Sequence, residues 1–321
     1  MKRLIIIPAL FLLFISCEKV IPFDTSLSQH EMVLNAVPSA DKQLFVYFAH
    51  TRFFLDSTNY QPLTDVDMTI TVNGTDYRPT SVDRCNYFFD YTVRENDNLS
   101  IRIHADGKDV TASTIVPPLP RISQPVAFTT DTGVFNLLIV NFNIDDYPNH
   151  KDYYCITLRQ RDSGSRYSPY FERYDTIDTV FNTIFFCNDL DLIDPYLAAN
   201  ASVAGFTSLN QLLTADDNID GQNHNTTLTL IRLRDTNEVI PYIHQYSLDI
   251  ESVSPERYRY LHDIANATTI LQFLTEPPAV YSNVNGAVGI FAANARRTFP
   301  LITLTGGTLP PPEQTSNKHP R

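Results

Sequence analysis

The chain contains no tryptophan among its 321 residues, although it has 17 tyrosines and 20 phenylalanines. Tryptophan offers the widest aromatic platform for stacking against a sugar, so its absence weakens a carbohydrate-binding interpretation and leaves tyrosine as the remaining platform. The eight histidines show no HExxH spacing and the four cysteines form no CxxC pair, so a zinc site has no support. There is no GxSxG motif, and the ten glycines include no phosphate-binding loop. Glycoside hydrolases use paired carboxylates, but with 36 acidic residues some spatial pairs are inevitable, so such pairs are not evidence for this activity. No catalytic residue is therefore predicted.

Basic residues are also scarce, with 24 lysines and arginines against 36 aspartates and glutamates and a net charge of −12. No block of basic residues interrupts the acidic chain. Because nucleic acids and anionic lipid headgroups attract clustered positive charge, this composition argues against both as electrostatic partners.

A signal-peptide pattern opens the chain. Met1-Lys2-Arg3 is a short basic start, and Leu4–Ser16 is an uncharged apolar run of 13 residues. A membrane-spanning helix needs about 20 residues, so this run has the length of a signal-peptide core. Cys17 follows directly, as in bacterial lipoprotein signals, although Phe14 is bulkier than the usual leucine. A plain secretory signal or an amino-terminal membrane anchor is the alternative.

We therefore expect residues 1–16 to be removed, Cys17 to carry lipid chains such as palmitate, and residues 17–28 to form a tether. The mature chain would have a net charge of −14. Lipid chains, at about 0.8 kcal/mol per buried methylene, would then supply the membrane attachment. Glu18 after the cysteine favours the outer membrane, and the sparse acidic residues that follow leave open whether the protein faces the exterior or the periplasm.

The other three cysteines allow at most one intramolecular disulfide bond. Cys155 and Cys187 both lie in strand-like runs of the same region, so they form one candidate pair. The alternative is that they are buried free thiols, which is the ordinary role of cysteine in a protein core, and we favour it.

Strand-like segments dominate the chain, which predicts a mostly β protein. Short runs rich in Val, Ile, Thr, Tyr and Phe, separated by turn residues, fill residues 29–116. Asn73-Gly74 suits the two-residue turn of a hairpin. We predict an immunoglobulin- or transthyretin-like β-sandwich over residues 29–116, ended by a proline-rich linker at residues 117–120.

A second β-rich domain is predicted for residues 121–305, with one main helix near residues 254–272. Ser254 suits the helix cap, and the helical spacing of apolar residues after it predicts a face packed on the second sheet. A shorter helix is expected at Ser208–Leu213. The strand within Ala287–Ala293 is expected to close the second sheet, with Gly289 allowing close backbone approach. Residues 306–321 have too little apolar surface to fold and are predicted to be a disordered tail.

The candidate lipoprotein cysteine is followed by an acidic residue, a β domain and then the motifs LTADDNIDGQ, SPERYRYL and EPPAVYSNVNGAVGIFAA. With them the chain resembles a family of outer-membrane lipoproteins of Bacteroidota, catalogued as a domain of unknown function (number 4249). The resemblance covers nearly the whole mature chain, and its most specific parts are PPAVYSNVNGAVGIF and DDNIDG. Members are often encoded beside TonB-dependent receptors, so the resemblance implies a receptor-associated lipoprotein and no catalytic residues.

An incomplete calcium-loop pattern lies in the second region. Asp216, Asn218 and Asp220 fall at its first, third and fifth positions. Thr227 stands where the pattern needs glutamate, and no amphipathic helices clearly flank the loop. We favour a turn whose side chains cap backbone amides, so no cofactor is predicted.

A segment rich in aromatic residues and arginine is the candidate partner-binding site. Its residues are Tyr167, Tyr170, Phe171, Arg173 and Tyr174. These residue types are enriched at protein interfaces, so an exposed cluster would bind a partner. Packing of the same rings against the second sheet is the alternative.

These features predict a lipid-anchored outer-membrane accessory protein that is not an enzyme. It would act with a TonB-dependent β-barrel receptor in substrate capture or uptake. The two alternatives are a structural or adhesive surface lipoprotein and an uncharacterised hydrolase with its site between the two domains.

Overall fold

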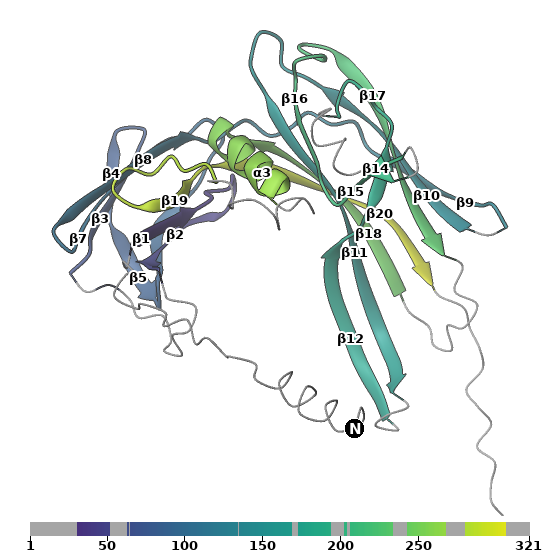
Figure 1. The fold of residues 1–321 in the computed structure, drawn as a ribbon, viewed down its shortest axis with the longest axis horizontal. Helices are drawn as coiled ribbons and strands as arrows, with labels where there is room; N and C mark the ends of the chain where they lie inside the picture. Colours follow the sequence, from purple (N-terminus) through teal and green to yellow (C-terminus); the bar gives the residue numbers. More distant parts are fainter. Residues whose placement is uncertain are drawn as a thin grey trace, which may run out of the picture.

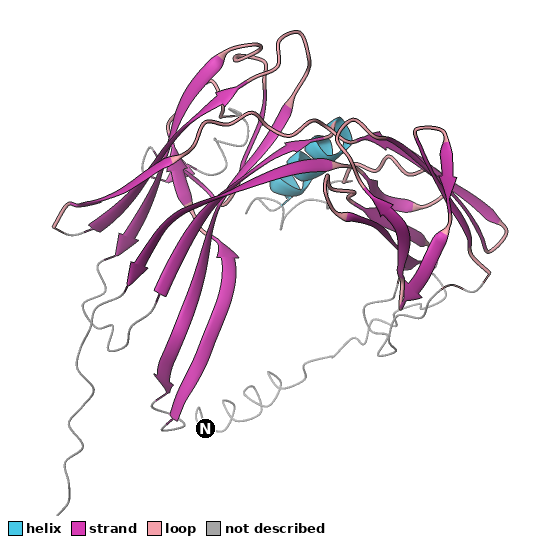
Figure 2. Ribbon diagram, turned by 180° about the vertical axis from the view of Figure 1, so that it is seen from behind, coloured by secondary structure: helices cyan, strands magenta, loops and turns pink. Residues whose placement is uncertain are grey.

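The computed structural model describes residues 31–51, 63, 65–133, 135–168, 173–193, 202–203, 206–233, 243–267 and 280–305. This described part contains four β-sheets and the single helix α3 (Pro255–Ala267), which confirms the prediction of a mostly β protein. The sheets form two bodies, with α3 lying between them (Figures 1 and 2). Among the described residues, no helix has the length and apolar content needed to cross a bilayer.

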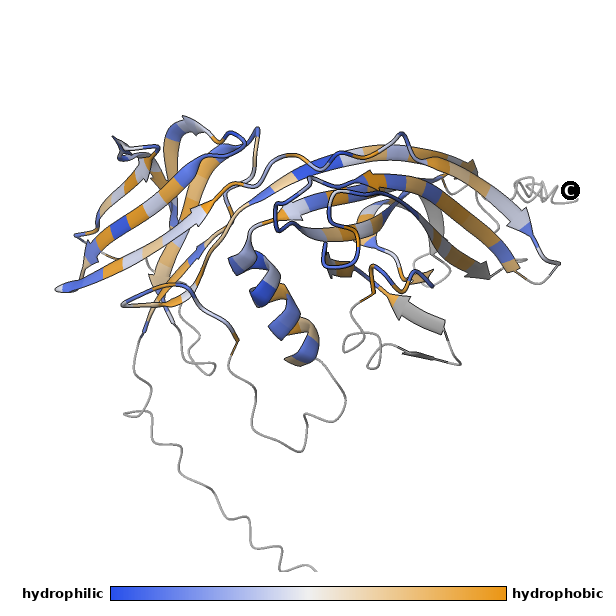
Figure 3. Ribbon diagram, turned by 90° about the horizontal axis from the view of Figure 1, so that it is seen from above, coloured by the Kyte–Doolittle hydropathy of each residue, from blue (hydrophilic) through white to orange (hydrophobic). Residues whose placement is uncertain are grey.

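The first body is a β-sandwich whose two sheets share one hydrophobic core. One sheet has the order β19-β1-β2-β6-β5, formed by β1 (Met32–Ala36), β2 (Gln43–His50), β5 (Pro79–Asp83), β6 (Asn86–Thr92) and β19 (Val288–Phe291). The facing sheet has the order β4-β3-β7-β8, formed by β3 (Asp67–Val72), β4 (Thr75–Tyr77), β7 (Asn98–Ala105) and β8 (Lys108–Ile115). Strand β7 shows how the sequence specifies this packing, because its buried and exposed residues alternate along its whole length. The same alternation of hydrophobic and hydrophilic residues is visible along other strands in Figure 3.

The predicted hairpin at Asn73-Gly74 is present between β3 and β4. Val72 pairs with Thr75, and both turn residues have positive φ angles, 49° and 86°. Positive φ at both central residues matches the twist of the flanking strands, and Asn-Gly is the residue pair that adopts it most readily.

The second body is also a β-sandwich with its own core. One sheet has the order β14-β15-β13-β17-β10-β9, formed by β9 (Val126–Asp131), β10 (Phe135–Asp145), β13 (Phe185–Cys187), β14 (Ser202–Val203), β15 (Phe206–Leu209) and β17 (Asn223–Leu233). The other has the order β12-β11-β18-β20, with β16 also paired to β11; its strands are β11 (Tyr153–Ser168), β12 (Arg173–Asn182), β16 (Leu212–Ala215), β18 (Ile243–Val253) and β20 (Asn294–Thr305).

The prediction of a short helix at Ser208–Leu213 is wrong. Residues 206–209 form β15 and residues 212–215 form β16. Leu212 and Leu213 are both buried, Leu212 in the main core of the second sandwich and Leu213 in a small cluster beside α3. A strand points successive side chains to opposite faces, so it buries this Leu-Leu pair in two different places.

The strand within Ala287–Ala293 does not close the second sheet as expected, but joins the first sandwich. β19 pairs in parallel with β1, and Leu34 lies opposite Gly289. Just before it, the backbone of Asn285 exchanges two hydrogen bonds with Thr111 of β8, at 2.9 and 3.0 Å. The chain therefore leaves the second sandwich after β18, adds a strand to the first, and returns to the second as β20.

The predicted helix is present and is held by both sandwiches, not by the second sheet alone. The Ser254 carbonyl accepts the Tyr258 N–H at 2.9 Å. On the side of the first sandwich, the Thr114 hydroxyl of β8 donates to Glu256 at 3.0 Å. On the side of the second, the Tyr258 ring lies 4.6 Å from the ring of Tyr153. α3 therefore bridges the two bodies.

We expect Ser254→Ala to destabilise the protein by about 1–2 kcal/mol, because the Ser254 hydroxyl accepts two backbone N–H groups. These are Arg257 at 3.4 Å, in the first turn of α3, and Ala293 at 3.1 Å, just after β19. Urea unfolding measures the change. The same substitution at the exposed Ser81 of β5 should change stability by less than about 0.5 kcal/mol, and an equal loss at both positions would contradict the capping role.

Candidate functional site

Strands β11 and β12 form a long hairpin that extends beyond the rest of its sheet, and we call the residues Arg159–Ser168 and Arg173–Asn182 the arm. Within it, β12 pairs with β11 from Asn182 opposite Arg159 to Arg173 opposite Ser168. The neighbouring strand β18 pairs with β11 only as far as Ser163. Beyond that point the described part of the arm is a two-stranded ribbon, which projects from the second sandwich in Figures 1 and 2.

The backbones of three candidate partner-binding residues lie at the far end of this arm. The backbone of Tyr167 lies opposite that of Tyr174, and Arg173 lies opposite Ser168. Tyr170, Phe171 and the side chains of the other three candidates lie outside the described residues.

The surface of the arm is exposed on both faces near its base. All residues from Asp178 to Asn182 are exposed, including Val180 at 53% and Phe181 at 44%. Successive strand side chains point to opposite faces, so this exposure shows that neither face is covered here. Arg161 and Asp178 join the two strands by a bidentate ion pair at 2.7 and 2.8 Å, which also lowers the pKa of Asp178.

A hollow of about 370 Å³ lies beside the base of the arm, and we call it the arm hollow. The lining includes Arg159, Arg161, Val180, Ser247 and Leu301. The pairing of β18 with β20 is irregular between Gln245 and Ser247, at this place in the sheet. Both arginines are ion-paired within the chain, Arg159 with Asp249 at 2.6 Å and Arg161 with Asp178, so the arm hollow offers a partner apolar groups and guanidinium groups whose charge is compensated.

The loop that contains the calcium pattern, residues 216–222 between β16 and β17, uses its side chains to cap backbone groups, as the turn interpretation predicts. Asp220 accepts the Asn149 N–H at 2.9 Å, and Asp216 accepts the Asp152 N–H at 2.8 Å. The Asn218 amide donates to the Asp191 carbonyl oxygen at 3.3 Å.

Asp216 belongs instead to a group that the sequence did not indicate. One oxygen from each of Asp146, Asp152 and Asp216 lies within 4.8 Å of the others, and we call these three residues the acidic cluster. Asp146 and Asp152 belong to the loop between β10 and β11, whereas Asp216 follows β16. The strand register that sets Tyr153 opposite Ala215 brings the two loops together, and only that register would have predicted the cluster.

The acidic cluster is electrostatically unusual because it is buried. Its members are 1%, 3% and 2% exposed in chain order. Burial raises the pKa of Asp152 to about 6; the contact with His150 opposes this rise, and the charges of Asp146 and Asp216 add to it.

Cys85, Cys155 and Cys187 are free and buried. The structure therefore has buried free thiols, the alternative favoured from the sequence, and no Cys155–Cys187 disulfide bond. Burial raises the pKa of the Cys155 thiol to about 12, which makes it a poor nucleophile. Cys17, the predicted lipidation site, lies outside the described residues.

The fold defines a protein of two β-sandwiches joined by a bridging helix and carrying a projecting hairpin. The profile of the family described as a domain of unknown function (DUF4249) matches residues 18–299. Because this match covers most of the chain, the chain belongs to that family. No curated protein matches it.

Proposed function

We propose that the protein is a lipid-anchored outer-membrane accessory protein that binds a TonB-dependent β-barrel receptor through the arm and assists substrate capture or uptake. The signal-peptide pattern before Cys17 supports the anchor. The resemblance to receptor-associated lipoproteins supports the kind of partner. The observation that carries the proposal is the arm, which extends beyond its sheet and exposes Val180 and Phe181 on opposite faces at its base.

The exposed edge strand and apolar side chains of the arm favour binding to another chain. β12 is the edge strand of its sheet, and unpaired strand edges and exposed apolar side chains favour association with another chain. Proteins use such edges to add strands or to dock a partner. The adjacent arm hollow supplies two arginines, a residue type that is enriched where partners bind. A receptor surface with apolar and polar groups would cover both features.

We expect Val180→Asp to reduce recovery of the receptor about tenfold, because it places a charge in an apolar contact. The measurement is affinity purification of the tagged protein from detergent-solubilised outer membranes, followed by quantification of the co-purified β-barrel. The matched control is Val82→Asp on β5, because Val82 and Val180 are each 53% exposed. The control should retain the receptor.

A second variant tests the two candidate residues that lie between β11 and β12 in the sequence. Tyr170→Ala combined with Phe171→Ala should also weaken recovery, because both residues are candidates for the partner contact. Unchanged recovery with both Val180→Asp and the Tyr170/Phe171 double variant would contradict binding through the arm. Recovery of the wild type without a receptor, together with measurable hydrolase activity, would contradict the proposed function itself.

A further inference from the structure

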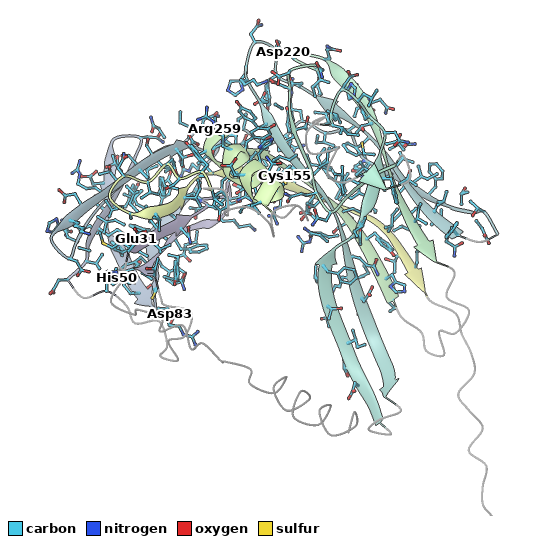
Figure 4. All side chains as sticks on the ribbon, in the orientation of Figure 1. Glu31, His50, Asp83, Cys155, Asp220 and Arg259 are labelled. Carbon is cyan, nitrogen blue, oxygen red and sulfur yellow. The ribbon has the colours of Figure 1, made fainter. Side chains whose placement is uncertain are left out.

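We propose that the acidic cluster, Asp146, Asp152 and Asp216, is a calcium-binding site that ties together two loops of the second sandwich. The loops are residues 146–152, between β10 and β11, and residues 216–222, between β16 and β17. Figure 4 places Asp220, in the second loop, at the end of the sandwich opposite to the arm. The site is therefore separate from the proposed receptor contact and does not depend on it.

Neutral or backbone donors hold two of the three carboxylates of the cluster in place. Asp146 accepts the Tyr154 hydroxyl at 2.6 Å and the Gly221 N–H at 2.9 Å. Asp216 accepts the Asp152 N–H at 2.8 Å. These bonds fix the position of the oxygens, and each carboxylate oxygen keeps a second lone pair for another partner.

The positive charge around the cluster does not balance three buried carboxylates. Lys151 contacts Asp216 at 2.7 Å, but it also contacts the exposed Asp217, so its charge is shared. His150 Nδ1 lies 2.7 Å from Asp152 Oδ1, and its side chain is 60% exposed. Buried charges without a counter-charge cost several kcal/mol each, so a further cation or a proton is needed here.

One oxygen of the cluster has no hydrogen-bond partner among the described residues. Asp152 Oδ2 is inaccessible to solvent and makes no hydrogen bond within the described structure. A buried acceptor of this kind is costly to leave unpaired, and protein structures rarely do so. It is an independent indication that the cluster receives a ligand.

The spacing of the three oxygens allows them to bind one cation, and their burial favours calcium. Calcium binds oxygen ligands at about 2.3–2.6 Å, so two ligands on opposite sides of one ion lie about 4.8 Å apart. The three cluster oxygens lie within that separation of one another. Magnesium needs stricter octahedral geometry at about 2.0–2.1 Å and keeps several waters, so a buried set of carboxylates favours the larger ion.

The test is thermal and urea unfolding of the whole mature protein after chelation, with and without about 10 mM calcium chloride. With a dissociation constant of about 0.1 mM, calcium should lower the unfolding equilibrium constant about 100-fold, and the same concentration of magnesium chloride should have a much smaller effect. Terbium ions should also bind and luminesce on excitation of tyrosine, because the Tyr154 hydroxyl is bonded to Asp146.

Asp152→Asn should abolish the calcium response, whereas the matched control Asp217→Asn should keep it. Asp217 lies in the second loop and shares Lys151, but it is not a member of the cluster. If Asp152→Asn does not fold, calcium stabilisation and terbium luminescence of the wild type still decide the test. No calcium stabilisation and no terbium luminescence in the wild type would overturn the proposal and leave a proton as the compensating charge. Equal loss of response in both variants would also overturn it, because binding would then be a diffuse surface effect.

Discussion

Gly286→Ala is expected to destabilise the protein by about 3–4 kcal/mol, whereas Gly74→Ala should cost only about 1–2 kcal/mol. The two glycines have nearly the same left-handed backbone conformation, with φ angles of 83° and 86°, so alanine would be strained to a similar extent at both. A Cβ atom at Gly74 would meet nothing within 4 Å, but a Cβ at Gly286 would lie 2.1 Å from the Asp109 carbonyl oxygen. The difference between the two variants therefore measures the close approach of this segment to the strand β8.

Urea unfolding of both variants, with the wild type as reference, is the measurement. The comparison tests whether residues 283–293, which come late in the chain, complete the first sandwich. Equal losses of stability in the two variants would mean that Gly286 does not lie against β8. Gly289→Ala provides a second probe, because its Cβ would lie 2.1 Å from the Leu34 carbonyl oxygen of β1.

Cys17→Ala is expected to abolish lipid labelling and to release the protein from the membrane fraction. The thiol of Cys17 is the atom that would be acylated, and an acidic chain has little electrostatic attraction to anionic headgroups. Several acyl chains, at about 0.8 kcal/mol per buried methylene, would make spontaneous release of the wild type negligible.

Metabolic labelling with a palmitate analogue, followed by membrane fractionation, measures both effects. Cys85→Ala is the control, because Cys85 is a buried free thiol of the first sandwich and should have no part in labelling. Equal labelling of the wild type and Cys17→Ala would contradict lipidation at this residue.

Local sequence was sufficient for the parts of the fold that depend on nearby residues. The fold class follows from strand-like alternation, which β7 keeps through all eight of its residues. Asn73-Gly74 predicts its hairpin through the positive φ angles that the turn needs. Ser254 and Pro255 predict the start of α3, because one caps free backbone N–H groups and the other fits a first helical turn.

Features that depend on pairing between distant segments could not be predicted in this way. The sequence predicts close backbone approach at Gly289, but no local pattern indicates that its partner is Leu34 in the first sandwich. The acidic cluster is also a product of tertiary pairing, since Asp152 and Asp216 meet only through the register of β11 with β16. A short Leu-Leu segment likewise carries too little periodicity to distinguish β16 from a helix.

The most direct test of the proposed function is site-specific photo-crosslinking in intact cells that produce the lipidated protein. A photoreactive residue replaces Val180 on the arm or, as the matched control, Val82 on β5, since both positions are 53% exposed. We predict a covalent product between position 180 and a TonB-dependent β-barrel receptor, and no such product from position 82. Absence of the receptor product at position 180, or equal amounts from both positions, would contradict binding through the arm.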